Sequence, residues 1–202
     1  MQDRKPWLFV DVETTGLTYA DRVITLGLIE YDPETSSVDC QHLIFNPGRP
    51  SNPFARAVHG YDDWQLRGQD PFDAHIPHLH ARFSRAGRVF AHNAAFDERF
   101  LRTEFSLAGG RLEHDAKFEC TLRAYKARHK MPGGLDKVIA HMGLESRGKQ
   151  HGALEDAWLC MRVHLWLNDM ACPEEIEDLR CVPQNWIEPE EPPLRGARIL
   201  RR

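Results

Sequence analysis

Three strand-like runs follow one another in the first 46 residues, and the spacers between them are short. The runs are residues 7–13 (WLFVDVE), 22–32 (RVITLGLIEYD) and 38–46 (VDCQHLIFN). The first ends at the turn TTG, and the cluster DPETSS separates the second from the third. Parallel neighbours need a crossover of a dozen or more residues, so this order predicts an antiparallel three-strand meander.

The remaining chain alternates between helical periodicity and one further buried strand. The expected strand is RVFAHN, residues 88–93, and residues 113–120 are expected to be extended. The expected helices are residues 53–59 with Asn52 as cap, 71–85 with a break near Pro77, 94–108 ending at Gly109–Gly110, 121–129, 135–144 and 153–168. Strands first, then strands mixed with helices, predict a mixed α/β sheet covered by helices on both faces.

The composition indicates one globular domain and a different tail. We expect residues 1–168 to form the domain, because a chain of 202 residues can bury a sizeable core. Residues 169–202 hold 5 of the 13 prolines and 8 acidic against 5 basic residues, so we expect a partly extended or disordered tail.

Charge and cysteine usage limit the classes of function. The net charge is −4, whereas a generic nucleic-acid binder is usually basic, but residues 81–130 carry 11 basic against 6 acidic residues. A basic flank beside acidic side chains suits an enzyme that cuts nucleic acid, and a solvated mixed-charge surface explains the counts equally well. The five scattered cysteines, with no membrane span and no signal core, predict a cytoplasmic protein.

Two acids stand at the end of the first apolar run. Strand alternation puts Asp11 and Glu13 on the same face, where a divalent cation would relieve their repulsion. An exposed strand end explains this short motif at least as well when it is taken alone.

A second polar group follows the strand at residues 88–93. Asp97 falls in the first turn of the next helix, where an acid also simply suits the helix dipole. His92 and Asn93 lie at the strand exit and can donate to a phosphate, although Asn93 also suits a helix cap.

The third group is HGALEDAW, which holds His151 and Asp156. Five positions on one regular helix would separate these side chains by about 140°. If His151 instead precedes the helix, with Gly152 permitting a turn, it can swing back over the acid. A histidine near a helix start is otherwise more often a surface residue.

Together these three groups resemble a known family. DVETTGL, HNAAFDERFL and HGALEDA resemble the Exo I, Exo II and Exo III motifs of the DEDD exonucleases, and the H-x4-D spacing implies the DEDDh branch. The resemblance extends over residues 7–167 and includes AVHGYDD, and the motifs are similar to those of DNA polymerase III epsilon proofreading subunits and exonuclease X. It implies a ribonuclease H-like sheet of five strands and 3′–5′ hydrolysis of phosphodiester bonds.

The resemblance also implies roles for individual residues. Two Mg²⁺ or Mn²⁺ ions would be held by Asp11, Glu13, Asp97 and Asp156, with His151 as general base. The terminal nucleotide would contact a larger set of candidates, each with a structural alternative: Thr14, Thr15, Gly16, Leu17, His59, His92, Asn93 and Phe96. An ordinary turn explains Leu17, and core packing explains Phe96, about as well.

Several functions remain open from the sequence. A 3′ end of DNA is the expected substrate, in proofreading or repair, and RNA trimming is the near alternative. A non-catalytic module that binds nucleic acid or a DNA polymerase, and a small-molecule metallohydrolase, share the same fold. Cys120 stands where epsilon proteins usually carry Asp, and the tail has no glutamine-led clamp-binding motif, so proofreading is not singled out.

Overall fold

The structure is a computed structural model of the whole chain. It describes residues 5–112, 118–144, 152–173 and 182–190. The candidate base His151 therefore lies outside the described residues, as do residues 113–117 of the expected extended piece.

Five strands form one sheet in the order β3-β2-β1-β4-β5. Their bounds are Trp7–Thr14 (β1), Val23–Tyr31 (β2), Val38–Ile44 (β3), Arg88–Ala91 (β4) and Glu119–Cys120 (β5). β1, β2 and β3 pair antiparallel, whereas β4 is parallel to β1 and β5 is parallel to β4. The predicted meander and the mixed five-stranded sheet are both confirmed.

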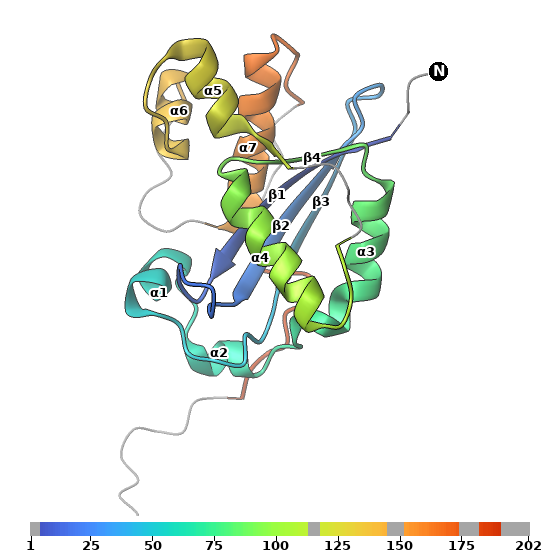
Figure 1. Cartoon of the computed structure of the whole chain (residues 1–202), viewed down its shortest axis with the longest axis vertical. Coiled ribbons are helices and arrows are strands. Elements are labelled where there is room, and N and C mark those ends of the chain that lie inside the picture. Colours follow the sequence, from blue (N-terminus) through green and yellow to red (C-terminus); the bar gives the residue numbers. More distant parts are fainter. Residues whose placement is uncertain (1–4, 113–117, 145–151, 174–181, 191–202) are drawn as a thin grey trace, which may run out of the picture.

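Helices cover both faces of the sheet, with α4 crossing one face and α7 lying behind the other (Figure 1). Their bounds are Pro53–His59 (α1), Asp63–Arg67 (α2), Ile76–Arg85 (α3), Ala94–Leu107 (α4), Thr121–His129 (α5), Leu135–His141 (α6) and Ala153–Leu167 (α7), and the 3-10 turn Phe72–His75 precedes α3. This arrangement confirms the predicted α/β fold with helices on both faces of the sheet.

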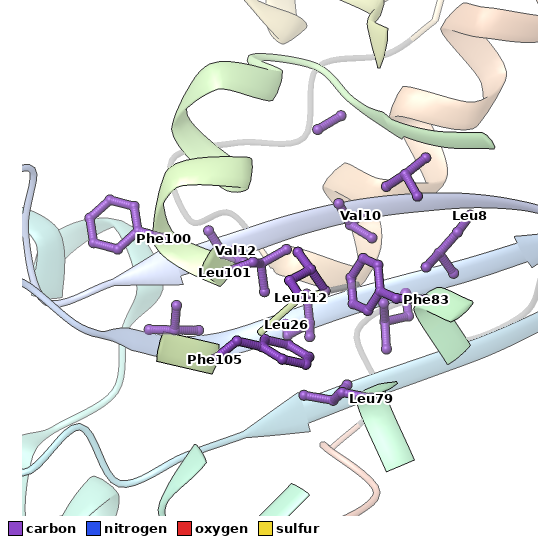
Figure 2. Close-up of a cluster of buried hydrophobic side chains, with 14 of the residues drawn as sticks. Leu8, Val10, Val12, Leu26, Leu79, Phe83, Phe100, Leu101, Phe105 and Leu112 are labelled. Carbon is purple, nitrogen blue, oxygen red and sulfur yellow. The ribbon is translucent and has the colours of Figure 1, made fainter. Parts of the chain in front are cut away.

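The alternation of β1 divides the core into two layers. Leu8, Val10 and Val12 point toward α3 and α4, where they pack with Phe83 and Phe105 (Figure 2). The intervening residue Phe9 belongs to the opposite layer and packs with side chains of α7. The period of two also assigns Asp11 and Glu13 to the α7 side of the sheet.

The helix limits follow local signals. Asn52 caps α1 by accepting a hydrogen bond from the Phe54 amide at 2.9 Å, and Pro53 occupies the first helical position as expected. The predicted break near Pro77 appears as the change from the 3-10 turn to α3 at Ile76. The short helix α2 was not predicted, although a capping box between Asp62 and Gln65 marks its start.

Part of the tail lies along β3. Gln184 exchanges hydrogen bonds with the backbone of His42, and Asn185 does the same with Ile44. Trp186 packs against buried Ile24, Ile44 and Leu66. This segment covers backbone groups of an edge strand that would otherwise be open to another chain.

None of the described helices combines the length and the apolar composition needed to cross a bilayer.

Candidate active site

A cavity of about 200 Å³ opens at the end of β1, next to the first turns of α4 and α7. Seven of the predicted site residues line it: Asp11, Glu13, His92, Asn93, Phe96, Asp97 and Asp156. Val12, Val58 and Leu135 complete the lining and were not singled out from the sequence. Carboxylates from three separate elements therefore meet at one edge of the sheet.

Asp11 and Glu13 reach this cavity because they alternate with buried residues of β1. Asp11 pairs with Gly27 of β2 and Glu13 pairs with Thr25, and the register shifts directly after Glu13. A register shift at a strand end bends the strand and changes the direction of the following residues. The strand thus leaves the sheet at the position where its two acids face the cavity.

Gly27 allows α7 to begin directly on the sheet. An ideal Cβ built on Gly27 would lie 2.1 Å from the carbonyl oxygen of Ala153 and 2.4 Å from the Leu154 amide nitrogen. Only glycine leaves room for this approach. Because Gly27 is also the partner of Asp11, the contact holds the first turn of α7, which carries Asp156, beside the acids of β1.

Asp97 is the most enclosed of the four acids, with 2% of its surface exposed. Its Oδ1 accepts a hydrogen bond from the Val12 amide at 3.2 Å, which ties α4 to the end of β1. Burial raises the pKa of Asp97 to about 7, although the backbone hydrogen bonds from Val12 and from Asp97 itself oppose this shift. A carboxylate so placed is stabilised in its charged form by a nearby cation.

His92 and Asn93 lie between β4 and α4. His92 Nδ1 is 3.0 Å from the Thr121 hydroxyl, so the ring is held against the start of α5. Asn93 occupies the cap position of α4, yet its side chain makes no capping hydrogen bond and instead lines the cavity. The cap alternative therefore does not account for this asparagine side chain.

The donor set of the cavity suits a hard divalent cation. Its four acids provide only oxygen ligands, which favour Mg²⁺ or Mn²⁺. Within the described ranges, no three His, Cys, Asp or Glu side chains already stand close enough to hold an ion.

The loop after β1 is organised by Asp21, which the sequence analysis missed. Its carboxylate accepts hydrogen bonds from the Thr18 amide and hydroxyl and from the Thr15 hydroxyl, at 2.7–2.9 Å. Burial raises the pKa of Asp21, but these bonds and the Arg49 charge outweigh it and hold the pKa below its ordinary value. Buried Thr15 thus supports the loop through Asp21, whereas the hydroxyl of buried Thr14 donates to the Gly16 carbonyl.

Gly16 and Leu17 line a second cavity, of about 420 Å³, beside the first. Leu17 is 78% exposed, so it is not the buried turn residue of the structural alternative. Arg99 donates to the Leu17 carbonyl at 3.2 Å and holds this part of the loop against α4.

His59 takes a different position from the other candidates. It is buried at the end of α1, lines neither cavity, and accepts a hydrogen bond from the Tyr61 amide through Nδ1. Burial lowers the pKa of His59 to about 4, so the ring is neutral at pH 7. Its immediate neighbour Val58 is the residue of this segment that reaches both cavities.

The chain matches the model of the exonuclease family over residues 8–164. The DNA polymerase III epsilon subunit of Escherichia coli K12 is 30% identical over 169 residues, which cover 78% of this chain and 69% of that protein. The epsilon subunit of Pasteurella multocida is 28% identical over 168 residues, covering 78% of this chain and 66% of that protein. The chain thus spans about two thirds of the length of these relatives.

Solved structures with the same fold include E. coli Exonuclease I with a dA16 oligonucleotide, at a TM-score of 0.69 and 19% identity, covering 82% of this chain and 41% of that one. A zinc-bound complex of the same exonuclease with single-stranded DNA has the same TM-score at 20% identity, covering 80% of this chain and 40% of that one. A 3′-exonuclease that recognises the histone mRNA stem-loop has a TM-score of 0.68 at 13% identity, covering 85% of both chains.

Exonuclease X with 5′-overhanging duplex DNA has a TM-score of 0.63 at 18% identity, covering 81% of this chain and 91% of that one. At these identities the structures show the shared fold, whereas the family match spans most of the chain. This chain belongs to the exonuclease family.

Proposed function

We propose that this chain is a 3′–5′ exonuclease that uses two divalent metal ions to release nucleoside 5′-monophosphates. The observation that carries the proposal is the single cavity lined by Asp11, Glu13, Asp97 and Asp156. Membership of the exonuclease family supports the reaction, and the lining residues supply the ligands that it needs.

The four carboxylates would hold two Mg²⁺ or Mn²⁺ ions. Two such ions about 4 Å apart activate a water molecule and neutralise charge on the phosphate during displacement. Asp11, Glu13 and Asp156 line the same cavity and would hold the first ion together. Asp97 would serve the second ion, and its raised pKa predicts that ion binding releases a proton from it near pH 7.

His151 is the proposed general base. It would take the proton from the attacking water as oxygen bonds to phosphorus, and the bond from phosphorus to the 3′ oxygen then breaks. That oxygen takes up a proton from solvent and becomes the 3′ hydroxyl of the shortened strand. The ordinary histidine pKa of about 6.5 suits this transfer near neutral pH. Helix α7 begins at Ala153, with Gly152 as its cap, so position 151 comes before the helix in the chain. This agrees with the proposed role, which requires a histidine that is not part of the regular helix.

The proposed substrate is the 3′ end of single-stranded DNA, in proofreading or repair. Its support is the similarity to epsilon subunits and to exonucleases crystallised with DNA. RNA is the alternative, favoured by the similarity to the 3′-exonuclease that binds the histone mRNA stem-loop. The 2′-hydroxyl distinguishes the two polymers.

A DNA polymerase is the proposed protein partner, since the relatives are named as polymerase subunits. The cytoplasm remains the proposed location. Among the described cysteines, Cys120 and Cys160 carry free thiols, which suits a reducing compartment.

The proposal is tested with oligonucleotides of DNA and RNA labelled at either the 3′ or the 5′ end, incubated with Mg²⁺. We expect a descending ladder from the 5′-labelled strand and immediate release of the labelled nucleotide from the 3′-labelled strand. The ratio of the rates on the two polymers assigns the substrate. Cleavage of neither polymer, or a ladder that begins at the 5′ end, would contradict the proposal.

A further inference from the structure

We propose that the 420 Å³ cavity beside the acids binds the second base from the 3′ end, stacked on Phe54. This inference rests on the proposed function and defines its substrate more closely: the 3′ end must be unpaired over at least two nucleotides. Phe54 belongs to α1 and was not among the residues predicted to contact the substrate.

Two elements form the walls of this cavity. Gly16, Leu17 and Thr18 provide one wall, and Phe54 and Val58 of α1 are in the other. The Asn52 amide donates to the Thr15 carbonyl at 2.7 Å, so the two walls are joined at their base. Its volume falls within the range of about 300–1,000 Å³ found for ligand pockets.

The cavity offers apolar contact more than hydrogen bonding. Its polar lining residues are Thr18, Asp21 and Asn52, and each is engaged within the protein: Thr18 donates to Asp21, and Asn52 accepts from the Phe54 amide. A base can still stack in such a space, because every base has an aromatic face. Stacking without base-edge contacts is tolerant of sequence, as an exonuclease requires.

The walls expose apolar side chains to water, which is unfavourable unless a ligand covers them. Phe54 is 85% exposed and Leu17 is 78% exposed, and both line the same cavity. Adjacent exposed apolar side chains around a hollow mark a binding site more often than scattered ones do. These two side chains face the solvent where an unpaired base could enter between them.

The position of the cavity selects the second base. Val58 lines this cavity and also the acidic one, so the two spaces adjoin. The bond that is hydrolysed joins the last two nucleotides, so a strand whose scissile phosphate lies at the acids carries one base on each side. Phe96 and Leu135 line the acidic cavity and suit the terminal base, which leaves the cavity of Phe54 for its neighbour.

The Leu17 wall is held in place from behind. The Arg99 side chain donates to the Leu17 carbonyl, and its guanidinium lies 5.0 Å from the ring centre of Tyr19 and 4.4 Å from that of Phe100. Cation–π contacts of this kind stabilise both partners. The wall is thus formed before the strand binds, which lowers the entropic cost of ordering it.

The test combines a protein variant with a modified strand. Binding of a 5′-fluorescent single-stranded DNA 12-mer, with a hydrolysis-resistant phosphorothioate as its last linkage, is measured by anisotropy with Mg²⁺, for the intact strand and for strands with an abasic site second or fifth from the 3′ end. The proteins are wild type, Phe54→Ala, Phe54→Trp and Leu107→Ala. Leu107 is a matched control because it is also an exposed apolar residue. It is the last residue of α4, far along the helix from Asp97, and it lines neither cavity.

We expect Phe54→Ala to weaken binding of the intact strand about 5- to 160-fold, the range for loss of one stacked base. The abasic site at the second position should weaken wild-type binding similarly, and Phe54→Ala should then add little. Phe54→Trp should retain affinity, and Leu107→Ala and the abasic site at the fifth position should have small effects.

The inference is overturned if Phe54→Ala weakens binding of the intact strand and of the strand lacking the second base by the same factor. It is also overturned if Phe54→Ala does not weaken binding at all. These outcomes are separable from failure of the proposed function. A wild-type protein that shortens DNA from the 3′ end but shows no coupling at Phe54 overturns only this inference. A wild-type protein that shortens no nucleic acid overturns the proposed function.

Discussion

Replacing Gly27 by alanine tests whether the contact between β2 and α7 positions the acids. The added Cβ would lie 2.1 Å from the Ala153 carbonyl oxygen, whereas ordinary contacts begin near 3.4 Å. The gap must therefore open by about 1.3 Å, the difference between these two distances. The three atoms nearest to the added Cβ are backbone atoms of Ala153 and Leu154, so no side chain can rotate away to make room.

The displacement should affect activity more than folding. Overpacking of a core typically costs about 1–3 kcal/mol, which a domain of this size can tolerate. Asp11 pairs with Gly27, and Asp156 lies in the first turn of α7, so the shift separates two of the acids that are proposed to share the metal ions. A misplacement of about 1 Å can reduce turnover on the order of 100-fold.

The assay measures initial rates on 5′-labelled single-stranded DNA with saturating Mg²⁺, at a temperature where circular dichroism shows both proteins folded. Gly68→Ala is the control, because its Cβ would meet no atom closer than 3.5 Å. We expect Gly27→Ala to lose on the order of 100-fold in kcat and Gly68→Ala to match wild type. Wild-type kcat in the folded Gly27→Ala protein would refute the positioning argument.

Three further outcomes follow from the described contacts. Glu104→Ala should lower the free energy of unfolding, measured in urea, by about 3 kcal/mol. The substitution leaves the partly buried Arg22 without its two hydrogen bonds of 2.8 and 2.6 Å to Glu104. A loss below about 1 kcal/mol would count against this reasoning. Burial, and then the charge of Arg88, lower the pKa of His164 to about 4 in the folded protein. The unfolded chain binds this proton near the ordinary histidine pKa of about 6.5, so the free energy of unfolding is unaffected above about pH 6.5 and falls as pH drops toward 4. His164→Leu should therefore flatten the stability profile in that window, and an unchanged slope would show that the buried ring does not cause it. Asp156→Asn should lower kcat by at least about 100-fold while unfolding at the wild-type urea concentration, and retained activity would remove Asp156 from the ligand set.

The sequence was most informative where a local period decided the structure. The alternation in WLFVDVE placed Asp11 and Glu13 on one side of β1, and the helix start after residues 88–93 placed Asp97 nearby. The short spacers among the first three runs sufficed to predict the antiparallel meander.

Features that depend on contacts between distant residues could not be read in this way. The approach of α7 to Gly27 involves residues 126 positions apart, and no local pattern distinguishes this glycine from one in a weak strand. The side-chain amides of Gln184 and Asn185 substitute for a strand beside β3, whereas the proline-rich composition around them indicated only an extended segment. The five residues of α2 were too few to show a helical period, and the capping role of Asp62 and Gln65 became apparent only from their hydrogen bonds.

The loop after β1 shows the same difference between local patterns and contacts of distant residues. TTGL was recognised as a turn, but Asp21 closes it through hydrogen bonds with Thr15 and Thr18, and Arg99 of α4 supports it from behind. Asp21 resembles any loop acid in the sequence, so its role became visible only from its burial and its partners.

The most direct measurement of the central claim is anomalous diffraction from crystals of the protein soaked with Mn²⁺ and a 3′-phosphorothioate dinucleotide. We expect two Mn²⁺ peaks about 4 Å apart in the cavity of Asp11, Glu13, Asp97 and Asp156. Crystals that bind the dinucleotide but show no Mn²⁺ in this cavity, or show it only elsewhere on the protein, would contradict the account.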